Sequence, residues 1–189
     1  MKKIISALLS GLMLISCTAA FADEPEAIAE EAVYTEEATL DAATLAAEAQ
    51  AAIADGTAET ATVIVNGKVM EFDMAPIILH GRTMVPMRAI FEELGATVNW
   101  YEDDQMIVAI RNASTVSASI TMHIGSTSMS FIDINHFIFK DINFDVPPFL
   151  LPLPDGNGDR TLVPVRVISE TFGAKVKWDE ASSTVTINL

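Results

Sequence analysis

The chain has 189 residues, a formal net charge of −15 at pH 7 and a hydrophobic content of 50%. An acidic chain of this kind repels the phosphates of nucleic acids, and no cluster of Lys and Arg with interleaved aromatic residues offsets the repulsion. The composition therefore excludes a nucleic-acid-binding protein. Cys17 is the only cysteine, so no disulfide can form within the chain and its stability must come from a hydrophobic core.

Residues 1–22 have the three parts of a secretory signal peptide. Met1-Lys2-Lys3 is a positive start, Ile4 to Ile15 is apolar, and Ala20-Phe21-Ala22 is a small-x-small cleavage site. The apolar stretch is too short to span a membrane. Alternatively, Leu14-Ile15-Ser16-Cys17 resembles a lipobox, in which Cys17 would carry the lipid of an anchored lipoprotein. Both alternatives predict a protein that is secreted or held in the cell envelope, with cleavage after Ala22 preferred.

Residues 23–61 predict an acidic linker that is partly helical or disordered. The segment is dominated by Ala, Glu and Thr, and it holds eleven acidic residues and no basic one. It offers too little apolar area to order itself as a domain. Within it, Asp41 is placed to begin a helix that runs to about Ala54, with Gly56 beyond its end. A solvated spacer is the favoured interpretation, and an amphipathic helix that binds a partner is the alternative.

The folded region is predicted from about Thr62 to Leu189. It opens with Val63-Ile64-Val65 and Lys68 to Phe72 on either side of Asn66-Gly67, which is the strongest short signal for a β-hairpin. A region of this length is large enough for one real core.

A segment of 19 residues occurs twice within this region. Arg82 to Trp100 reads RTMVPMRAIFEELGATVNW, and 78 positions later Arg160 to Trp178 reads RTLVPVRVISETFGAKVKW; eleven positions are identical. We interpret this as an internal duplication. In each copy, Pro86 or Pro164 suits the start of a short helix and Gly95 or Gly173 suits the residue after its end.

Apolar residues at helical spacing predict one buried face for each helix, formed by Met87, Ile90, Phe91 and Leu94 in the first copy and by Val165, Ile168 and Phe172 in the second. Two strands joined by an acidic turn should follow each helix, and another hairpin should form around Gly125-Ser126. The predicted fold class is α+β: antiparallel β-sheet packed on short α-helices, in two tandem similar units, about 62–112 and 113–189, fused into one domain.

These motifs together resemble the copper amine oxidase N-terminal-like domain, also called the stalk domain. The resemblance covers essentially all of Thr62 to Leu189, and it is carried by V-N-G-K, D-x-x-P, the doubled R-T-x-V-P-x-R, and L-G-A-x-V-x-W. In the second unit V-N-G-K is absent, and the loop from Leu151 to Gly158 is longer. The resemblance implies an antiparallel sheet wrapped around a helix and a non-catalytic role, because copper and the quinone of amine oxidases lie in a separate domain.

The sequence itself offers no catalytic or cofactor site. His80, His123 and His136 occur singly, whereas copper needs several imidazoles that converge on one point. No thiol, Gly-x-Ser-x-Gly elbow or phosphate-binding loop occurs in the folded region. We expect no enzyme activity and no cofactor. A weak calcium candidate is formed by Asp155, Asn157 and Asp159, which supply oxygen ligands at alternating positions; an ordinary polar turn is the favoured interpretation.

The repeated residues predict a structural motif, formed by Arg82, Pro86, Arg88, Gly95 and Trp100 and by Arg160, Pro164, Arg166, Gly173 and Trp178. The guanidinium groups should satisfy carbonyls where the chain turns, and Arg88 and Arg166 should pair with acidic turn residues such as Asp179. Holding an anionic glycan is the alternative for the arginines. The tryptophans should plug the interface between sheet and helix, with sugar stacking as the alternative.

These features predict a non-catalytic, secreted or cell-envelope module with a structural or binding role in display or adhesion. Its partner would be a cell-wall glycan or an envelope protein, and it would meet the membrane only through a lipid at Cys17. The alternative is an exported accessory or inhibitor protein that docks a partner through the apolar insertion from Phe149 to Pro154. For the insertion itself, folding back over the core is the favoured interpretation. A calcium-tuned envelope protein is a minor alternative. The oligomeric state is left open.

Overall fold

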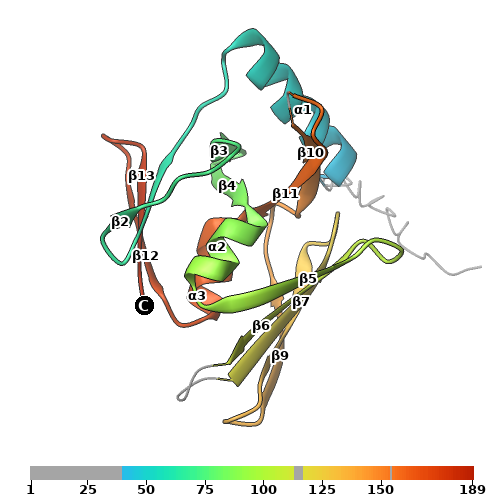
Figure 1. Cartoon of the computed structure of the whole chain (residues 1–189), viewed down its shortest axis with the longest axis vertical. Helices are drawn as coiled ribbons and strands as arrows, with labels where there is room; N and C mark the ends of the chain where they lie inside the picture. The colour runs from blue at the N-terminus through green and yellow to red at the C-terminus, as the bar shows by residue number, and fades with distance from the viewer. Residues whose placement is uncertain (1–39, 113–116, 154) are drawn as a thin grey trace, which may run out of the picture. The chain divides into compact units, whose positions relative to one another are not determined.

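The computed structural model describes residues 40–112, 117–153 and 155–189 (Figure 1). The predicted signal peptide and lipobox, together with the first part of the acidic linker, lie outside the described residues. Among the helices of the described ranges, none has both the length and the hydropathy that a membrane span requires.

Three sheets and three helices form the described part of the chain, which agrees with the predicted α+β class. The first sheet has the order β12-β13-β1-β2 and contains Lys175–Asp179, Thr184–Asn188, Thr62–Val65 and Lys68–Val69. The second has the order β10-β11-β4-β3 and contains Phe149–Pro152, Asp159–Pro164, Arg82–Pro86 and Ile77–Leu79. The third has the order β5-β6-β7-β8-β9 and contains Ala96–Tyr101, Met106–Asn112, Ser117–His123, Ser128–Asp133 and Ile138–Asn143.

The strands predicted around Asn66-Gly67, after each helix and around Gly125-Ser126 all form, whereas β3 (Ile77–Leu79), β9 (Ile138–Asn143) and β10 (Phe149–Pro152) have no counterpart among the predictions. The Asn66-Gly67 turn joins β1 to β2, and both residues have positive φ, 50° and 83°. The first strand also pairs in parallel with the last, β13. This pairing brings the two ends of the 62–189 region together in one sheet.

The two R-T-x-V-P-x-R segments lie side by side as the central strands β4 and β11 of the second sheet. They pair antiparallel around Val85 opposite Val163, so that Met84 faces Pro164 and Leu162 faces Pro86. Each position of one copy thus faces the position that mirrors it in the other copy. All of these side chains are buried.

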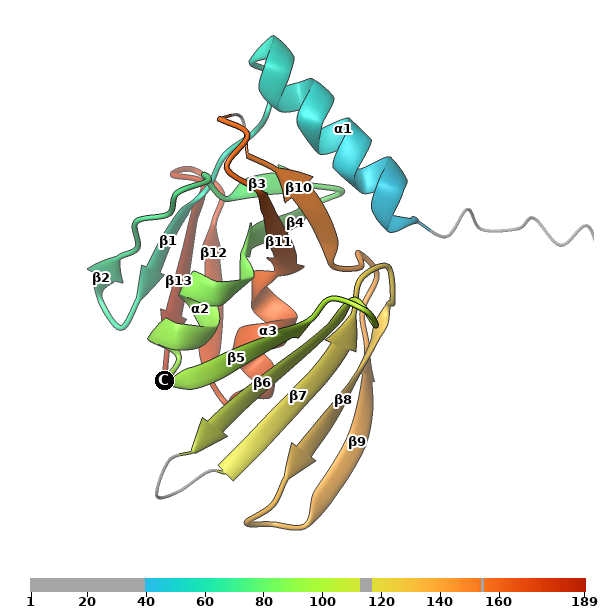
Figure 2. The ribbon, with the colours of Figure 1, turned by 45° about the vertical axis from the view of Figure 1, so that its right-hand side comes forward.

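Each repeated strand leads directly into a helix of seven residues, α2 (Met87–Glu93) or α3 (Val165–Thr171). Pro86 and Pro164 are the N-caps, one residue before the first helical residue, and Gly95 and Gly173 have φ of 78° and 88° after the helix ends. The predicted helix faces are buried in one common core that contains residues of both copies. Figure 2 shows the two helices lying next to each other, with β5 passing in front of α3.

One buried polar group in this core has no partner. Ser169 on α3 is 0% exposed, and its hydroxyl has no hydrogen-bond partner among the described residues. An unpaired buried hydroxyl costs about 1–3 kcal/mol. We therefore expect Ser169→Ala to raise the free energy of unfolding by about 1 kcal/mol, measured by urea denaturation. A loss of stability would contradict the unpaired state of this hydroxyl.

A second hydrophobic cluster lies between helix α1 (Ala42–Asp55) and the second sheet. Asp41 caps the helix by accepting a hydrogen bond from the Thr44 N–H (2.9 Å), and Gly56 ends it with φ of 75°. Leu45 and Ala49 are 0% and 1% exposed. The packed body therefore begins earlier than the predicted boundary at Thr62, and this helix is not a solvated spacer.

The apolar insertion forms part of the same cluster rather than an exposed loop. Phe149 and Leu151 of β10 are 0% and 1% exposed, and α1 packs against this strand. Leu153 is also buried. The insertion thus folds back over the core, and it offers little of its apolar surface for a protein partner.

Candidate functional site

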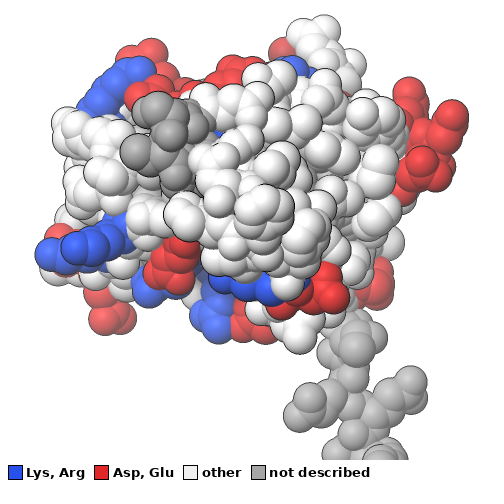
Figure 3. Space-filling view, turned by 90° about the horizontal axis from the view of Figure 1, so that it is seen from below, with Lys and Arg blue, Asp and Glu red and all other residues white. Residues whose placement is uncertain are grey.

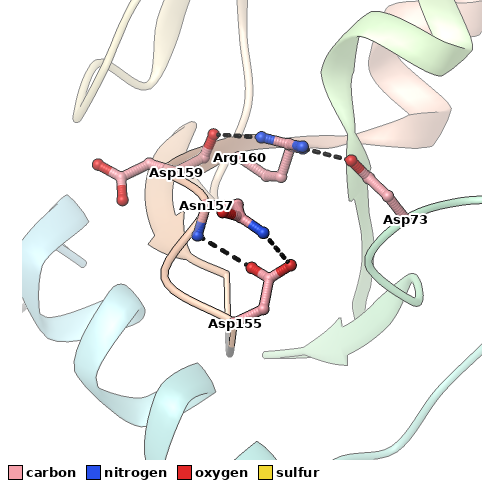
Figure 4. A network of polar contacts seen from close by, with 5 residues as sticks. All are labelled: Asp73, Asp155, Asn157, Asp159 and Arg160. Carbon is pink, nitrogen blue, oxygen red and sulfur yellow. Dashed lines mark hydrogen bonds and ion pairs between the residues drawn. The ribbon is translucent and has the colours of Figure 1, made fainter.

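The arginines that open the two repeated segments form matching ion pairs. Arg82 donates from Nε and Nη2 to Asp145 (3.1 and 2.5 Å), and Arg160 donates from Nε to Asp73 (2.5 Å). Each arginine also donates from Nη1 to the carbonyl of the residue before it, Gly81 or Asp159 (3.1 and 3.0 Å). Figure 4 shows the Arg160 arrangement. As predicted, a guanidinium group satisfies a carbonyl at each bend.

The ion pairs cross between the two copies. Asp73 precedes the first copy but binds the arginine of the second, while Asp145 precedes the second copy and binds the arginine of the first. Both acids belong to the same short motif, F-D-x-x-P, at Phe72 and Phe144. The resemblance described above rests on D-x-x-P in the first unit only. The second F-D-x-x-P motif is hidden by its spacing. The two arginines are 78 positions apart, whereas the two aspartates are 72 apart, because the loop before Arg160 is longer than the loop before Arg82.

These ion pairs contribute little to the stability of the fold. The side chains are 48% and 57% exposed in the Arg82 pair, and 35% and 51% exposed in the Arg160 pair. Exposed ion pairs contribute about 0–1 kcal/mol. The two F-D-x-x-P loops are therefore oriented mainly by the buried strands that they flank.

The Arg82 pair gives a pH-dependent contribution to stability. Burial raises the pKa of Asp145, but the hydrogen bond and charge of Arg82 outweigh it, so that the pKa lies below its ordinary value. A carboxyl whose pKa is lowered on folding stabilises the fold above its unfolded pKa, and this stabilisation is lost as the pH falls through the folded pKa. We expect Arg82→Gln to raise the pKa of Asp145, measured by NMR titration of its carboxyl carbon. An unchanged pKa would contradict the pairing.

The second arginine of each copy has a different environment from the predicted one. Among the described residues, Arg88 and Arg166 form no ion pair, and Asp179 instead accepts hydrogen bonds from the Ala181 N–H and the Ser182 hydroxyl. The predicted pairing with acidic turn residues is therefore wrong. Both arginines are exposed on the first turn of their helices, and each lines a groove.

Groove 1 lies beside the N-terminal turn of α2 and has a volume of about 750 Å³. Its apolar lining includes Phe72, Met87 and Trp100. Five carboxylates line it against two guanidinium groups: Glu71, Asp73, Glu92, Glu102 and Asp159 against Arg88 and Arg160. Groove 1 therefore carries a negative potential, and it disfavours an anionic ligand.

Groove 2 lies beside the N-terminal turn of α3 and has a volume of about 340 Å³. It is built from the matching positions of the repeats, including Arg82 and Asp145, Phe144, and Arg166. In groove 2 the cations outnumber the carboxylates: Arg82, Lys140 and Arg166 are present with Asp145 and Glu170. Matching positions of the two similar segments thus line two grooves of different size and charge.

The two tryptophans occupy different environments although their positions in the repeat match. Trp100 is partly buried, packs against the common core and lines groove 1. Trp178 is 37% exposed and belongs to neither core cluster. The prediction that both plug the interface between sheet and helix therefore holds for Trp100 only.

The calcium candidates do not converge on one point. The Asp155 carboxylate accepts hydrogen bonds from the backbone N–H of Asn157 (3.0 Å) and from its side-chain amide (2.7 Å). Figure 4 shows the Asp159 carboxylate pointing away from that pair. These contacts are those of a polar turn. In the part of the chain that the structure describes, no group of three or more His, Cys, Asp or Glu residues is placed to hold a metal ion.

Comparison with protein families matches residues 64–187 to the model of the copper amine oxidase N-terminal domain. Comparison with curated proteins and with solved structures finds no match. The matched region contains the hairpin around Asn66-Gly67, both R-T-x-V-P-x-R segments and both grooves. The chain therefore belongs to the copper amine oxidase N-terminal domain family, a family of non-catalytic stalk domains.

Proposed function

We propose that the chain is an exported, non-catalytic module of the cell envelope that binds a wall glycan in groove 1. The observation that supports this most directly is Trp100 at the wall of an open groove that also holds several hydrogen-bonding side chains. An indole ring offers a flat apolar surface with one polar edge. The CH-rich face of a pyranose ring suits such a surface, and the sugar hydroxyls suit neighbouring carboxylates and amides.

The charge of groove 1 narrows the class of glycan. Its carboxylates outnumber its guanidinium groups by five to two, so a glycan rich in carboxylates or phosphates would be repelled. A neutral or amino sugar is favoured, and Glu92, Glu102 and Gln105 are the acceptors we assign to its hydroxyl or amino groups. The anionic glycan considered for the arginines is disfavoured at groove 1.

We further infer that the two R-T-x-V-P-x-R segments are the centres of two half-modules. Three observations support this: the mirrored pairing around Val85 and Val163, the crossed ion pairs, and the matching grooves. The strands that follow the helices join different sheets, β5 and β6 in one and β12 and β13 in the other. Duplication followed by divergence of one groove accounts for a single acidic binding site.

Two tryptophan variants test the glycan proposal. Binding is measured by co-sedimentation with insoluble peptidoglycan and by calorimetric titration with a β-1,4-linked N-acetylglucosamine tetramer and its de-N-acetylated form. Trp100→Ala should weaken binding by at least about tenfold, since loss of an aromatic contact costs about 1–2 kcal/mol or more. Trp178→Ala is the matched control and should bind as the unchanged protein does, with both variants folded by circular dichroism.

Two outcomes would overturn the glycan proposal: no binding of any of these glycans by the unchanged protein, or equal losses in the two variants. Export of the chain is tested separately by mass spectrometry of the mature N-terminus. We expect Asp23 as the first residue, and a diacylglyceryl Cys17 would identify the tethered alternative. An unprocessed Met1 would contradict export through the predicted signal peptide.

A further inference from the structure

The edge strand β9 carries an unusual concentration of exposed apolar side chains. Phe137 and Phe139 are 83% and 71% exposed, and Ile134 and Ile138 are 58% and 44% exposed. All four lie on β9 or in the turn that leads into it. Figure 3 views the molecule from this end, and uncharged side chains form the centre of the view while charged ones lie mainly around its margin.

The other five sheet edges in the described ranges are shorter, covered or charged. The strands β2 and β3 have two and three residues, β10 is covered by α1, and β5 lies against α2. The fifth edge, β12, carries Lys175, Lys177 and Asp179. Short length, cover and charge are the ordinary means by which proteins keep sheet edges from pairing. By contrast, the edge strand β9 has six residues, an apolar surface and no covering helix among the described elements.

The two charges on β9 are turned back onto its neighbour β8. The Lys140 ammonium lies 5.1 Å from the centre of the Phe131 ring, and the Asp141 carboxylate accepts a hydrogen bond from the Ser130 hydroxyl (2.9 Å). Neither charge is therefore directed along the free edge, where it would oppose the approach of another strand. The free edge is left with unpaired backbone groups beside Ile138 and Phe139.

We propose that this edge is the interface of a homodimer, in which β9 pairs antiparallel with β9 of a second copy. The register follows from symmetry: a two-fold axis that continues a sheet stands perpendicular to it, so residues that face each other lie on the same face. Centring the pair on Lys140 or Asp141 would oppose like charges, which is destabilising. Centring it on Ile138, the first residue of β9, would use turn residues for half of the ladder. Centring it on Phe139 places the two Phe139 rings together and Ile138 opposite Lys140.

This register also joins the apolar surfaces of the two sheets. Ile132 faces Phe139 across the β8–β9 pair. In the dimer these two side chains would be followed by Phe139 and then Ile132 of the second copy, which gives one apolar row across four strands. Cross-strand aromatic pairs are among the more stabilising pairs in sheets. A second copy is the occupant because the edge is self-complementary in this register, and because the outer-face residues around Phe139 include one carboxylate, that of Asp141, so that repulsion between two acidic chains is weakest here.

The first test is the mass of the mature protein by sedimentation equilibrium over a range of concentrations. The unchanged protein should be a reversible dimer, and Phe139→Lys should raise its dissociation constant at least about tenfold by placing like charges on the axis. Val69→Lys is the matched control, because Val69 is 58% exposed on another edge strand, β2; its dissociation constant should be unchanged.

The second test reads the register and does not depend on the affinity. In a Cys17→Ser background, Phe139→Cys should form a covalent dimer on mild oxidation, since facing residues lie within the Cα distance of about 4.4–6.8 Å that a disulfide needs. Ile138→Cys, one residue away, should form it at least about tenfold more slowly, because its nearest copy is diagonal and beyond that distance. A monomer at the highest concentration tested, or equal cross-linking of the two variants, would overturn the proposal.

Discussion

Phe91→Ala is expected to lower the free energy of unfolding by about 3–5 kcal/mol, the cost of removing a fully buried aromatic side chain. Phe91 is 0% exposed, and its ring packs edge-to-face on Phe172 with 5.8 Å between the centroids. The substitution leaves a cavity where α2 meets the C-terminal end of α3. Urea denaturation followed by far-UV circular dichroism measures the effect.

Truncation to alanine at an exposed position is the control for this prediction. Val69 is 58% exposed on β2, away from the proposed dimer edge, so Val69→Ala should change the free energy of unfolding by no more than about 0.5 kcal/mol. A loss of less than about 1 kcal/mol for Phe91→Ala would contradict a tightly packed contact between the two helices.

Leu45→Ala is expected to lower the free energy of unfolding by about 2–3 kcal/mol, within the range for truncating a buried leucine side chain to alanine. Leu45 is fully buried between α1 and the second sheet. Because it anchors a helix at one end of the described chain, the loss should be greatest in α1 itself. Hydrogen exchange of the α1 amides should therefore accelerate more than exchange in the central sheet strands β4 and β11.

Gln50→Ala provides the control on the same helix. Gln50 is exposed on α1, and Ala is the stronger helix former, so stability should be unchanged or raised by a few tenths of a kcal/mol. If Leu45→Ala altered neither stability nor exchange in α1, the helix would be the solvated spacer that the composition of residues 23–61 favours, and the packed body would begin near Thr62.

The duplicated segments were predictable because each carries its own local signals. Pro86 and Gly95 delimit the first helix, and apolar residues at helical spacing fix the face that it buries. Helix α1 was also located, through Asp41 and Gly56. Its burial was not predicted, because two apolar residues, Leu45 and Ala49, are too few to distinguish a docking helix from a solvated one when the first residue of its partner strand, Phe149, is 100 or more positions away from them.

Long-range pairing is the information that local patterns do not contain. The parallel pairing of β1 with β13 and the crossed partners of Arg82 and Arg160 depend on how distant strands meet. The strand β9 was missed because Lys140 and Asp141 interrupt its apolar residues, which removes the alternation typical of a strand. The exposure of Trp178 was not predicted, because the matching sequence position gives no sign of its different surroundings. Trp100 lines groove 1 and packs against the common core, whereas Trp178 does neither.

The central claim is that both copies of the repeated segment share one interior and unfold as one unit. Each copy contains one tryptophan, and the chain has no other, so Trp178→Phe and Trp100→Phe leave one fluorescent probe in each copy. Urea unfolding of these two variants, followed by tryptophan fluorescence and by far-UV circular dichroism, tests the claim most directly. The account predicts that the two signals coincide in midpoint and slope within each variant. A fluorescence transition that separates from the circular dichroism transition in either variant would show that the copies unfold independently.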